Sequence, residues 1–276
     1  MHGVADREGT DPSLAVLLTE TRSCRYCRDV AVAGPAQRAL SFGTVADAYD
    51  RFRPGPPRSA VEWILRSNCG IAADIGAGTG AFTRRLSELA DSVVAIEPDA
   101  RMLAVLRRSA PSALAIRGRA EQLPVGPASL DAAMVSSAWH WMDPQVTVAE
   151  LGRVLRPGGI LGIVSNGADR SVEWVNELLG PRNPASDRGT RPSRRDFVLP
   201  AGSPFVDLES ELVSWSLPMT GDQLVGLAGT YSSTITLAPR QRERELARVR
   251  AVAESISGTD PVGLPMRCRC WRAVRE

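Results

Sequence analysis

Residues 71–80 read IAADIGAGTG, and this stretch decides how the rest of the chain is interpreted. Its first five residues are mostly apolar, as in a buried parallel strand, and Gly76, Gly78 and Gly80 follow at once. Glycine allows positive φ angles and lets the backbone approach a ligand with no Cβ in between. The next residues, AFTRRLSELA, have the pattern of a helix. A ligand would therefore meet bare N–H groups and the start of a helix at this turn.

On spacing alone, the turn fits two classes of cofactor. Gly76, Gly78 and Ala81 also satisfy the G-x-G-x-x-G/A pattern of dinucleotide-binding folds, and Glu97 lies 21 residues beyond Gly76. A nicotinamide-dependent oxidoreductase is thus one alternative that the spacing leaves open.

Strand and helix patterns alternate from residue 70 onward, as a doubly wound parallel α/β sheet requires. We predict strands at 70–75, 92–97, 113–117, 130–136 and 159–165, and helices at 80–90, 99–109 and 144–155. Ligands of such sheets lie beyond the carboxyl ends of the strands. The candidate site residues follow these ends, namely Asp74 with the glycines, Glu97, Ala120 with Glu121, and Ser136 onward.

Composition narrows the class of protein. The 276 residues fit one large domain, or a domain with a cap, and their formal net charge is +2. A near-neutral chain gives no electrostatic argument for binding nucleic acid or a membrane surface. All 33 basic residues are arginine, which excludes a lysine nucleophile. The apolar run LAVLL at 14–18 is too short for a signal peptide core, so we expect a cytoplasmic protein.

The cysteines do not suggest a disulfide framework or a metal site. They stand at positions 24, 27, 69, 268 and 270. Cys24-x-x-Cys27 is half of a zinc site by spacing, but no second pair follows, and the histidines are His2 and His140. Free thiols are therefore favoured, and no metal is expected.

Six segments together resemble the class I S-adenosylmethionine (SAM)-dependent methyltransferases, in particular the small-molecule branch that includes trans-aconitate methyltransferase. They are FGTVADAYDRFRPGPP at 42–57, DIGAGTG at 74–80, AIEPDARML at 95–103, GRAEQLP at 118–124, SSAWHWMD at 136–143 and RVLRPGG at 153–159. The resemblance is clearest over residues 40–165. It implies a Rossmann-like seven-stranded sheet, mostly parallel with the last strand antiparallel, and a cap of helices and loops.

This resemblance also implies an organisation for the whole chain. We expect a poorly ordered N-terminal extension at 1–40, lid helices at 41–66, the SAM-binding core at 67–165, and an acceptor-side cap with the closing strands at 166–276. Within the last region, helices are predicted at 171–179 and 241–255, and strands at 205–215 and 265–273.

The resemblance assigns roles to residues around the predicted crevice. Glu97 would bind the ribose hydroxyls, for which a carboxylate has two acceptor oxygens. Asp74 would hold the amino-acid end of SAM, although an aspartate there could instead satisfy the N–H groups of the turn. The remaining cofactor candidates are Tyr49 in the lid, the turn residues Gly76, Ala77, Gly78 and Gly80, the purine walls Pro98 and Met102, the adenine contacts Ala120 and Glu121, and Ser136. Met102 could equally be core.

The chemistry leaves two candidates on the acceptor side. A neutral thioether leaves without a general acid, so the protein mainly aligns the reactants. A protonated acceptor would need a base, for which His140 is available unless it only holds its loop. An acceptor carboxylate would instead need an arginine clamp, for which Arg53 is preferred to Arg191 and Arg195 unless it is simply solvated.

We therefore expect a SAM-dependent methyltransferase that acts on an oxygen, hydroxyl or carboxylate, of a small molecule and releases S-adenosylhomocysteine. The alternatives are a SAM-binding protein without turnover and the oxidoreductase described above. We expect a monomer or homodimer that binds neither nucleic acid nor membranes.

Overall fold

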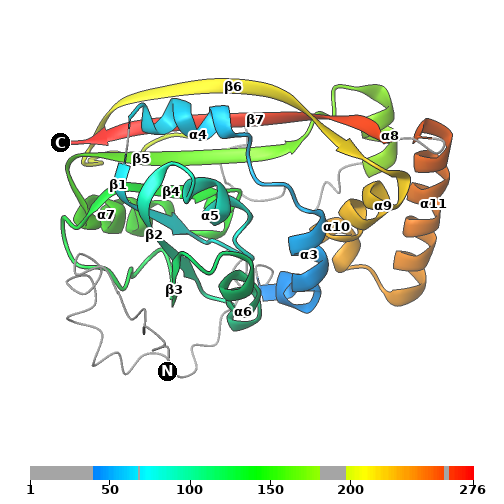
Figure 1. Cartoon of the computed structure of the whole chain (residues 1–276), viewed down its shortest axis with the longest axis horizontal. Coiled ribbons are helices and arrows are strands. Elements are labelled where there is room, and N and C mark those ends of the chain that lie inside the picture. Colours follow the sequence, from blue (N-terminus) through cyan, green and yellow to red (C-terminus); the bar gives the residue numbers. More distant parts are fainter. Residues whose placement is uncertain (1–39, 68, 181–196, 258–260) are drawn as a thin grey trace, which may run out of the picture.

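A seven-stranded sheet forms the centre of the computed structural model, which describes residues 40–67, 69–180, 197–257 and 261–276 (Figure 1). Its strand order is β3-β2-β1-β4-β5-β7-β6. The strands are β1 (Cys69–Ile75), β2 (Ala90–Glu97), β3 (Leu114–Arg117), β4 (Leu130–Ser136), β5 (Leu155–Ala168), β6 (Phe205–Met219) and β7 (Val262–Arg275). Of these, β7 runs antiparallel to both β5 and β6, while the β3-to-β5 pairs are parallel. The predicted fold class and the antiparallel last strand are confirmed.

Several sequence predictions fall outside the described residues. They are the order of the N-terminal extension, the Cys24–Cys27 pair, His2, and the weaker clamp candidates Arg191 and Arg195.

The order of the strands places the ligand crevice. The chain moves from β1 outward through β2 to β3, and then returns to pair β4 with the other side of β1. Asp74, near the end of β1, is level with Ala95 of β2 and with Met134 of β4. The crevice at such a switch point lies beyond the carboxyl ends of β1 and β4.

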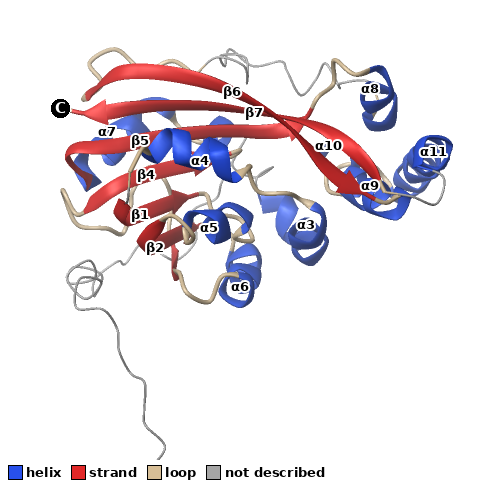
Figure 2. Cartoon of the chain, turned by 45° about the horizontal axis from the view of Figure 1, so that its top comes forward, coloured by secondary structure: helices blue, strands red, loops and turns tan. Residues whose placement is uncertain are grey.

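Helices cover both faces of the sheet, because neighbouring residues of each inner strand point to opposite sides (Figure 2). On one face, α4 (Arg58–Leu65) and α5 (Ala81–Leu86) pack on Ala72 and Ala132. On the other, α7 (Pro144–Val154) packs on Ala73 and Ala133. Two apolar cores result, one on each face.

The lid is formed by η2 (Leu40–Val45) and α3 (Ala46–Phe52). It rests on α6 (Ala100–Ser109), where Ala46 packs with Met102 and Val105. Helices are therefore present in the predicted lid region at 41–66, and α3 lies beside the carboxyl ends of the strands.

The cap gathers at the far end of the long β6–β7 ribbon (Figure 1). It contains α8 (Glu173–Leu179), α9 (Gly221–Gly229), α10 (Ser232–Ile235) and α11 (Pro239–Ser257). Of these, α8, α9 and α11 share an apolar core with Met219 and Met266. The predicted helices at 171–179 and 241–255 are present. The helices α9 and α10 were not predicted, although Thr220 and Gln223 form a capping box at the start of α9.

The start of β5 differs from its prediction. Residues 155–159, where the sequence predicts a turn between the helix at 144–155 and the strand at 159–165, already belong to β5. The partners of β4 jump from Leu155 to Ile160, and Gly158 has a φ of 78°. The turn is thus an interruption within the strand rather than a connection before it. Among the described residues, no helix combines the length and apolarity needed to cross a bilayer.

Candidate functional site

The glycine turn after β1 has the geometry that its sequence predicts. Gly76, Gly78 and Gly80 have φ angles of 71°, 59° and 92°, which side chains rarely tolerate. The N–H of Gly76 donates to the Ile96 carbonyl oxygen at 2.8 Å, so the turn is anchored to β2. A Cβ added at Gly76 would lie 2.8 Å from the Cβ of Ala138. At Gly76 the packing therefore leaves no room for a side chain.

Glu97, at the end of β2, is fixed by two backbone donors. Its Oε2 accepts from the N–H of Gly78 and its Oε1 from the N–H of Asp99, each at 2.8 Å. Burial raises the pKa of this carboxyl to about 7, while the two backbone hydrogen bonds act in the opposite direction. Each carboxylate oxygen has a second lone pair. Glu97 is thus oriented by the turn and keeps acceptor capacity for a ligand.

Asp74 is fully buried, and only one of its two carboxylate oxygens has a hydrogen-bond partner in the described part of the chain. Its Oδ2 accepts from the Thr83 hydroxyl at 2.7 Å, but its Oδ1 has no hydrogen-bond partner among the described residues. Burial raises its pKa to about 7, the hydrogen bonds of Thr83 lower it, and the Glu97 charge raises it further. Buried polar atoms are nearly always paired, so an unpaired carboxylate oxygen in a cavity wall points to a bound cation or donor.

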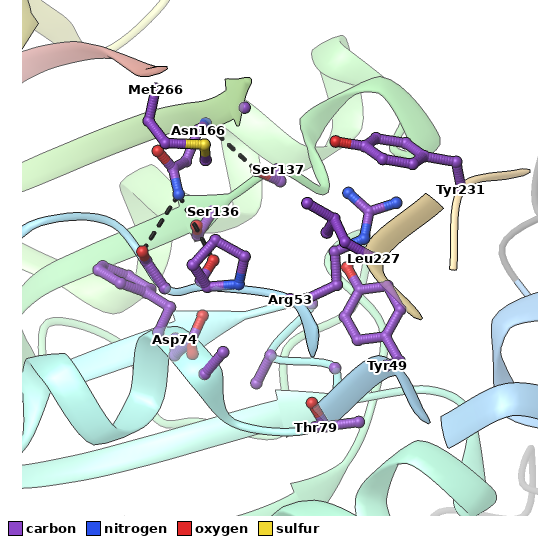
Figure 3. Close-up of a pocket in the computed structure, with 18 residues that line it drawn as sticks. Tyr49, Arg53, Asp74, Thr79, Ser136, Ser137, Asn166, Leu227, Tyr231 and Met266 are labelled. Carbon is purple, nitrogen blue, oxygen red and sulfur yellow. Dashed lines mark hydrogen bonds between the residues drawn. The ribbon is translucent and has the colours of Figure 1, made fainter. Parts of the chain in front are cut away.

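A cavity joins Asp74 and the glycine turn to the lid and the cap (Figure 3). Its empty space, including space open to solvent, is about 650 Å³. The predicted residues that line it are Tyr49, Arg53, Asp74, Gly76, Ala77, Gly78 and Ser136. Ser137, within the predicted stretch from Ser136 onward, lines it too, whereas the sequence-based prediction missed Asn166, Leu227, Tyr231 and Met266. Asn166 directly follows the predicted strand at 159–165, so the strand-end rule could have found it.

Arg53 lies between the lid and the cap. Its Nε donates to the Thr230 hydroxyl at 2.9 Å and its Nη2 to the Thr230 carbonyl oxygen at 3.1 Å. The guanidinium carbon stands 4.0 Å from the ring centre of Tyr231 and 5.3 Å from that of Tyr49. No carboxylate pairs with Arg53 within the described ranges. Its charge is therefore held in one orientation beside the cavity.

The lid linker, residues 53–57, is attached to the end of β5 by Asn166. The side-chain nitrogen of Asn166 donates to the carbonyl oxygens of Gly55 at 3.1 Å and Pro54 at 3.4 Å. Its side-chain oxygen accepts from the indole N–H of Trp215 at 3.2 Å. Asn166 thus links the linker to β6 through the sheet.

The other predicted residues do not line this cavity. Glu97 accepts from the N–H of Gly78 in the glycine turn, Gly80 is the N-cap of α5, and Met102 and Ala120 are buried in apolar clusters. The carbonyl oxygen of Pro98 accepts from Arg117, and Glu121 accepts from the Asp143 N–H at 3.2 Å. His140 lies in η3 (Trp139–Trp141), and its ring centre is 4.4 Å from that of Trp141.

Within the part of the chain that the structure describes, no three histidine, cysteine or acidic residues are grouped as metal ligands. The site instead offers carboxylates, backbone N–H groups and one arginine, which suit a polar organic ligand.

Comparison with known proteins finds methyltransferases. The family profile described as a methyltransferase domain matches residues 73–163. An uncharacterized methyltransferase of Mycobacterium tuberculosis is 38% identical over 243 residues, which cover 86% of this chain and 96% of that protein. The malonyl-[acyl-carrier protein] O-methyltransferase of Pectobacterium atrosepticum is 32% identical over 145 residues, or 50% of this chain and 56% of that one.

A solved structure, described as a type II methyltransferase from Anaeromyxobacter dehalogenans, has 26% identity and a TM-score of 0.57. The match covers 82% of this chain and 98% of that chain. The similarity therefore extends over the lid, the sheet and the cap rather than over the glycine turn alone.

Proposed function

This chain belongs to the class I SAM-dependent methyltransferases, and from that membership we propose that it transfers the methyl group of SAM to an oxygen atom of a small-molecule acceptor. The observation that supports this most directly is the unpaired, fully buried Oδ1 of Asp74 in the cavity wall. A buried carboxylate oxygen without a partner is costly unless a ligand supplies one. The ammonium group of SAM is a ligand of the required charge.

The remaining cofactor candidates fit the same ligand. Glu97 keeps acceptor capacity on both oxygens, which suits the two hydroxyls of a ribose. Gly76 and Gly78 present backbone without side chains to the cavity, which Tyr49 of the lid also lines (Figure 3). We propose Pro98, Met102, Ala120 and Glu121 for the adenine end, beyond the lined cavity.

The chain's part in catalysis is then mainly alignment. SAM supplies a methyl group on a positively charged sulfur, and the neutral thioether departs without a general acid. Walls on several sides would restrict how an acceptor approaches the bound cofactor, and positioning of this kind accounts for large rate effects. The cavity is walled by the lid, by strand ends and by the cap.

Oxygen is the proposed accepting atom for two reasons. The Pectobacterium relative is named for O-methyl transfer to a malonyl group, although the match covers half of this chain. Arg53 offers an oriented guanidinium beside the cavity, which would hold an acceptor carboxylate. Such an acceptor is already anionic and needs no base, whereas a hydroxyl acceptor would require one. His140 is our candidate for that base. The cytoplasmic location and the monomeric or homodimeric state of the protein stay predictions.

Isothermal titration with SAM and with NAD tests the proposal. We expect SAM to bind and NAD not to bind. Glu97→Ala should weaken SAM binding by about 2 to 4 kcal/mol, because charge-assisted hydrogen bonds are lost. Glu88→Ala is the matched control, since Glu88 pairs with Arg58 and Arg85 and does not line the cavity.

Tighter binding of NAD than of SAM would contradict the proposal, and an unchanged dissociation constant in Glu97→Ala would remove Glu97 from the site. Methyl transfer from labelled SAM to a panel of hydroxy and carboxylic acids separates an enzyme from a SAM-binding protein without turnover. Tight binding without any transfer would favour the second.

A further inference from the structure

The linker between the lid and α4 has an unusual hydrogen-bonding capacity. Its sequence, RPGPP at 53–57, contains three prolines, and proline has no backbone N–H. The linker is therefore attached to the rest of the protein mainly through its carbonyl oxygens, which require a donor. Arg53, Pro54 and Gly55 line the cavity. Whatever holds these carbonyl groups also sets the position of one cavity wall.

Asn166 supplies that donor. The Trp215 indole N–H can only donate, so it must face the amide oxygen of Asn166. The two carbonyl oxygens of Pro54 and Gly55 can only accept, so they must face the amide nitrogen, which carries two hydrogens. The orientation of the amide is thus fixed by its partners, and each hydrogen faces one linker carbonyl group (Figure 3).

The linker is also close to the glycine turn. A Cβ added at Gly55 would lie 2.6 Å from the carbonyl oxygen of Ala81, the first residue of α5. On its other side, Arg53 is bound to Thr230 of the cap. The linker therefore crosses from the cap to the start of α5, with Asn166 at its middle.

We propose that Asn166 is a positioning residue that holds the linker at residues 53–57 against the cofactor side of the cavity. It acts through the carbonyl groups of Pro54 and Gly55, and it controls SAM release and the alignment of the methyl group. This inference rests on the proposed function, because it concerns the cavity in which SAM is proposed to bind.

The isosteric variant Asn166→Asp tests the inference. It keeps an oxygen toward Trp215 but turns a second oxygen toward the two carbonyl groups, which loses both linker hydrogen bonds. We expect labelled SAM, chased with unlabelled SAM, to dissociate at least about tenfold faster, as the loss of two net hydrogen bonds implies. We also expect kcat to fall. The matched control is Trp215→Phe, which removes the other partner of Asn166 and leaves the linker bonds in place.

A pH series gives a readout that a purely structural role would not change. On acidification the introduced carboxyl group gains a proton and can again donate one hydrogen bond to the linker. The ratio of the variant rate to the wild-type rate should therefore shrink between pH 8 and pH 5.5. Asp74 lines the same cavity as residue 166, so its titration is coupled to that of the introduced carboxyl group. The series is therefore repeated with Asp74→Asn in both proteins, where the ratio should still shrink. None of the four partners of Asn166 is titratable.

Three results would overturn the inference. They are a wild-type release rate in Asn166→Asp, equally fast release in Trp215→Phe, and a rate ratio that does not change with pH. If Asn166→Asp does not fold, Asn166→Ala is measured against Trp215→Phe in the same way. A wild-type protein that binds no SAM would overturn the proposed function and this inference together, whereas normal wild-type binding with an unaffected variant would overturn this inference alone.

Discussion

Asp74 and Glu97 are buried carboxyl groups whose pKa values are raised from 3.8 and 4.5 to about 7. Burial is the main cause in both, because a low-dielectric environment disfavours the charged form. In the empty protein the folded state therefore binds protons more tightly than the unfolded chain does. Its free energy of unfolding should fall as the pH rises from about 4 to about 7.

The affinity for SAM should change with pH in the opposite direction. A cationic ligand favours the ionised carboxylates, so binding releases protons and strengthens as the pH rises through 7. The slope should reach at most about tenfold per pH unit for each carboxyl group. Titration calorimetry in buffers of different ionisation enthalpy measures the proton release. Asp74→Asn should remove part of the dependence, and an affinity that is constant from pH 5.5 to 8 would contradict this prediction.

Individual site residues were predictable where a local pattern carries them. Asp74, Glu97 and Ser136 lie at the carboxyl ends of their strands, and the glycines form the turn after β1. Tyr231 and Leu227 were missed because their place in the cavity depends on contacts between distant segments, such as Arg53 with Thr230, 177 residues apart. No pattern of apolar and polar residues within either segment indicates such a contact. The raised pKa values likewise depend on burial that only the folded chain creates.

At the scale of elements, the linker and the start of α5 approach so closely that one methyl group matters. In Gly55→Ala the added Cβ would lie 2.6 Å from the Ala81 carbonyl oxygen, a backbone atom that cannot turn away. Overpacking of this kind costs about 1–3 kcal/mol. We expect weaker SAM binding by a similar free energy, measured by titration calorimetry.

Gly167→Ala is the matched control for that change. Gly167 lines the same cavity, yet a Cβ added there meets no atom within 4 Å. SAM affinity should therefore stay at the wild-type value in this variant. Equal losses of affinity in the two variants would show that any methyl group at the cavity is harmful, and would remove the special role of the linker.

Most elements of the Rossmann-like core were predictable to within a few residues, because apolar strands and amphipathic helices alternate there. The exact ends of these helices and strands were less predictable. The helix predicted at 80–90 stops at Leu86 because β2 already begins at Ala90. The strands β6 and β7 are longer than predicted, since they pair with each other well beyond the core, from Val206 with Val274 to Met219 with Val262. Pairing of this length depends on the partner strand rather than on either sequence alone.

For the whole molecule, cofactor binding should appear as thermal stability. A ligand that binds only the folded state at one hundred times its dissociation constant adds about 2.7 kcal/mol. For a chain of this size that corresponds to a rise in Tm of roughly 5 °C or more. We expect this rise with SAM and with S-adenosylhomocysteine in differential scanning fluorimetry. NAD at the same concentration is the control, and an equal shift with NAD would contradict the proposed specificity.

The position of β7 between β5 and β6 has a consequence for synthesis in the cell. In the described sheet, β6 pairs with β7 alone, yet β6 leaves the ribosome first, followed by α9, α10 and α11. Until β7 emerges, the outer edge of β5 and both edges of β6 carry unsatisfied backbone groups, which invite pairing with other nascent chains. We expect a chain stalled before Val262 to be held by chaperones. Its cavity would still lack the part of the wall that Met266 provides.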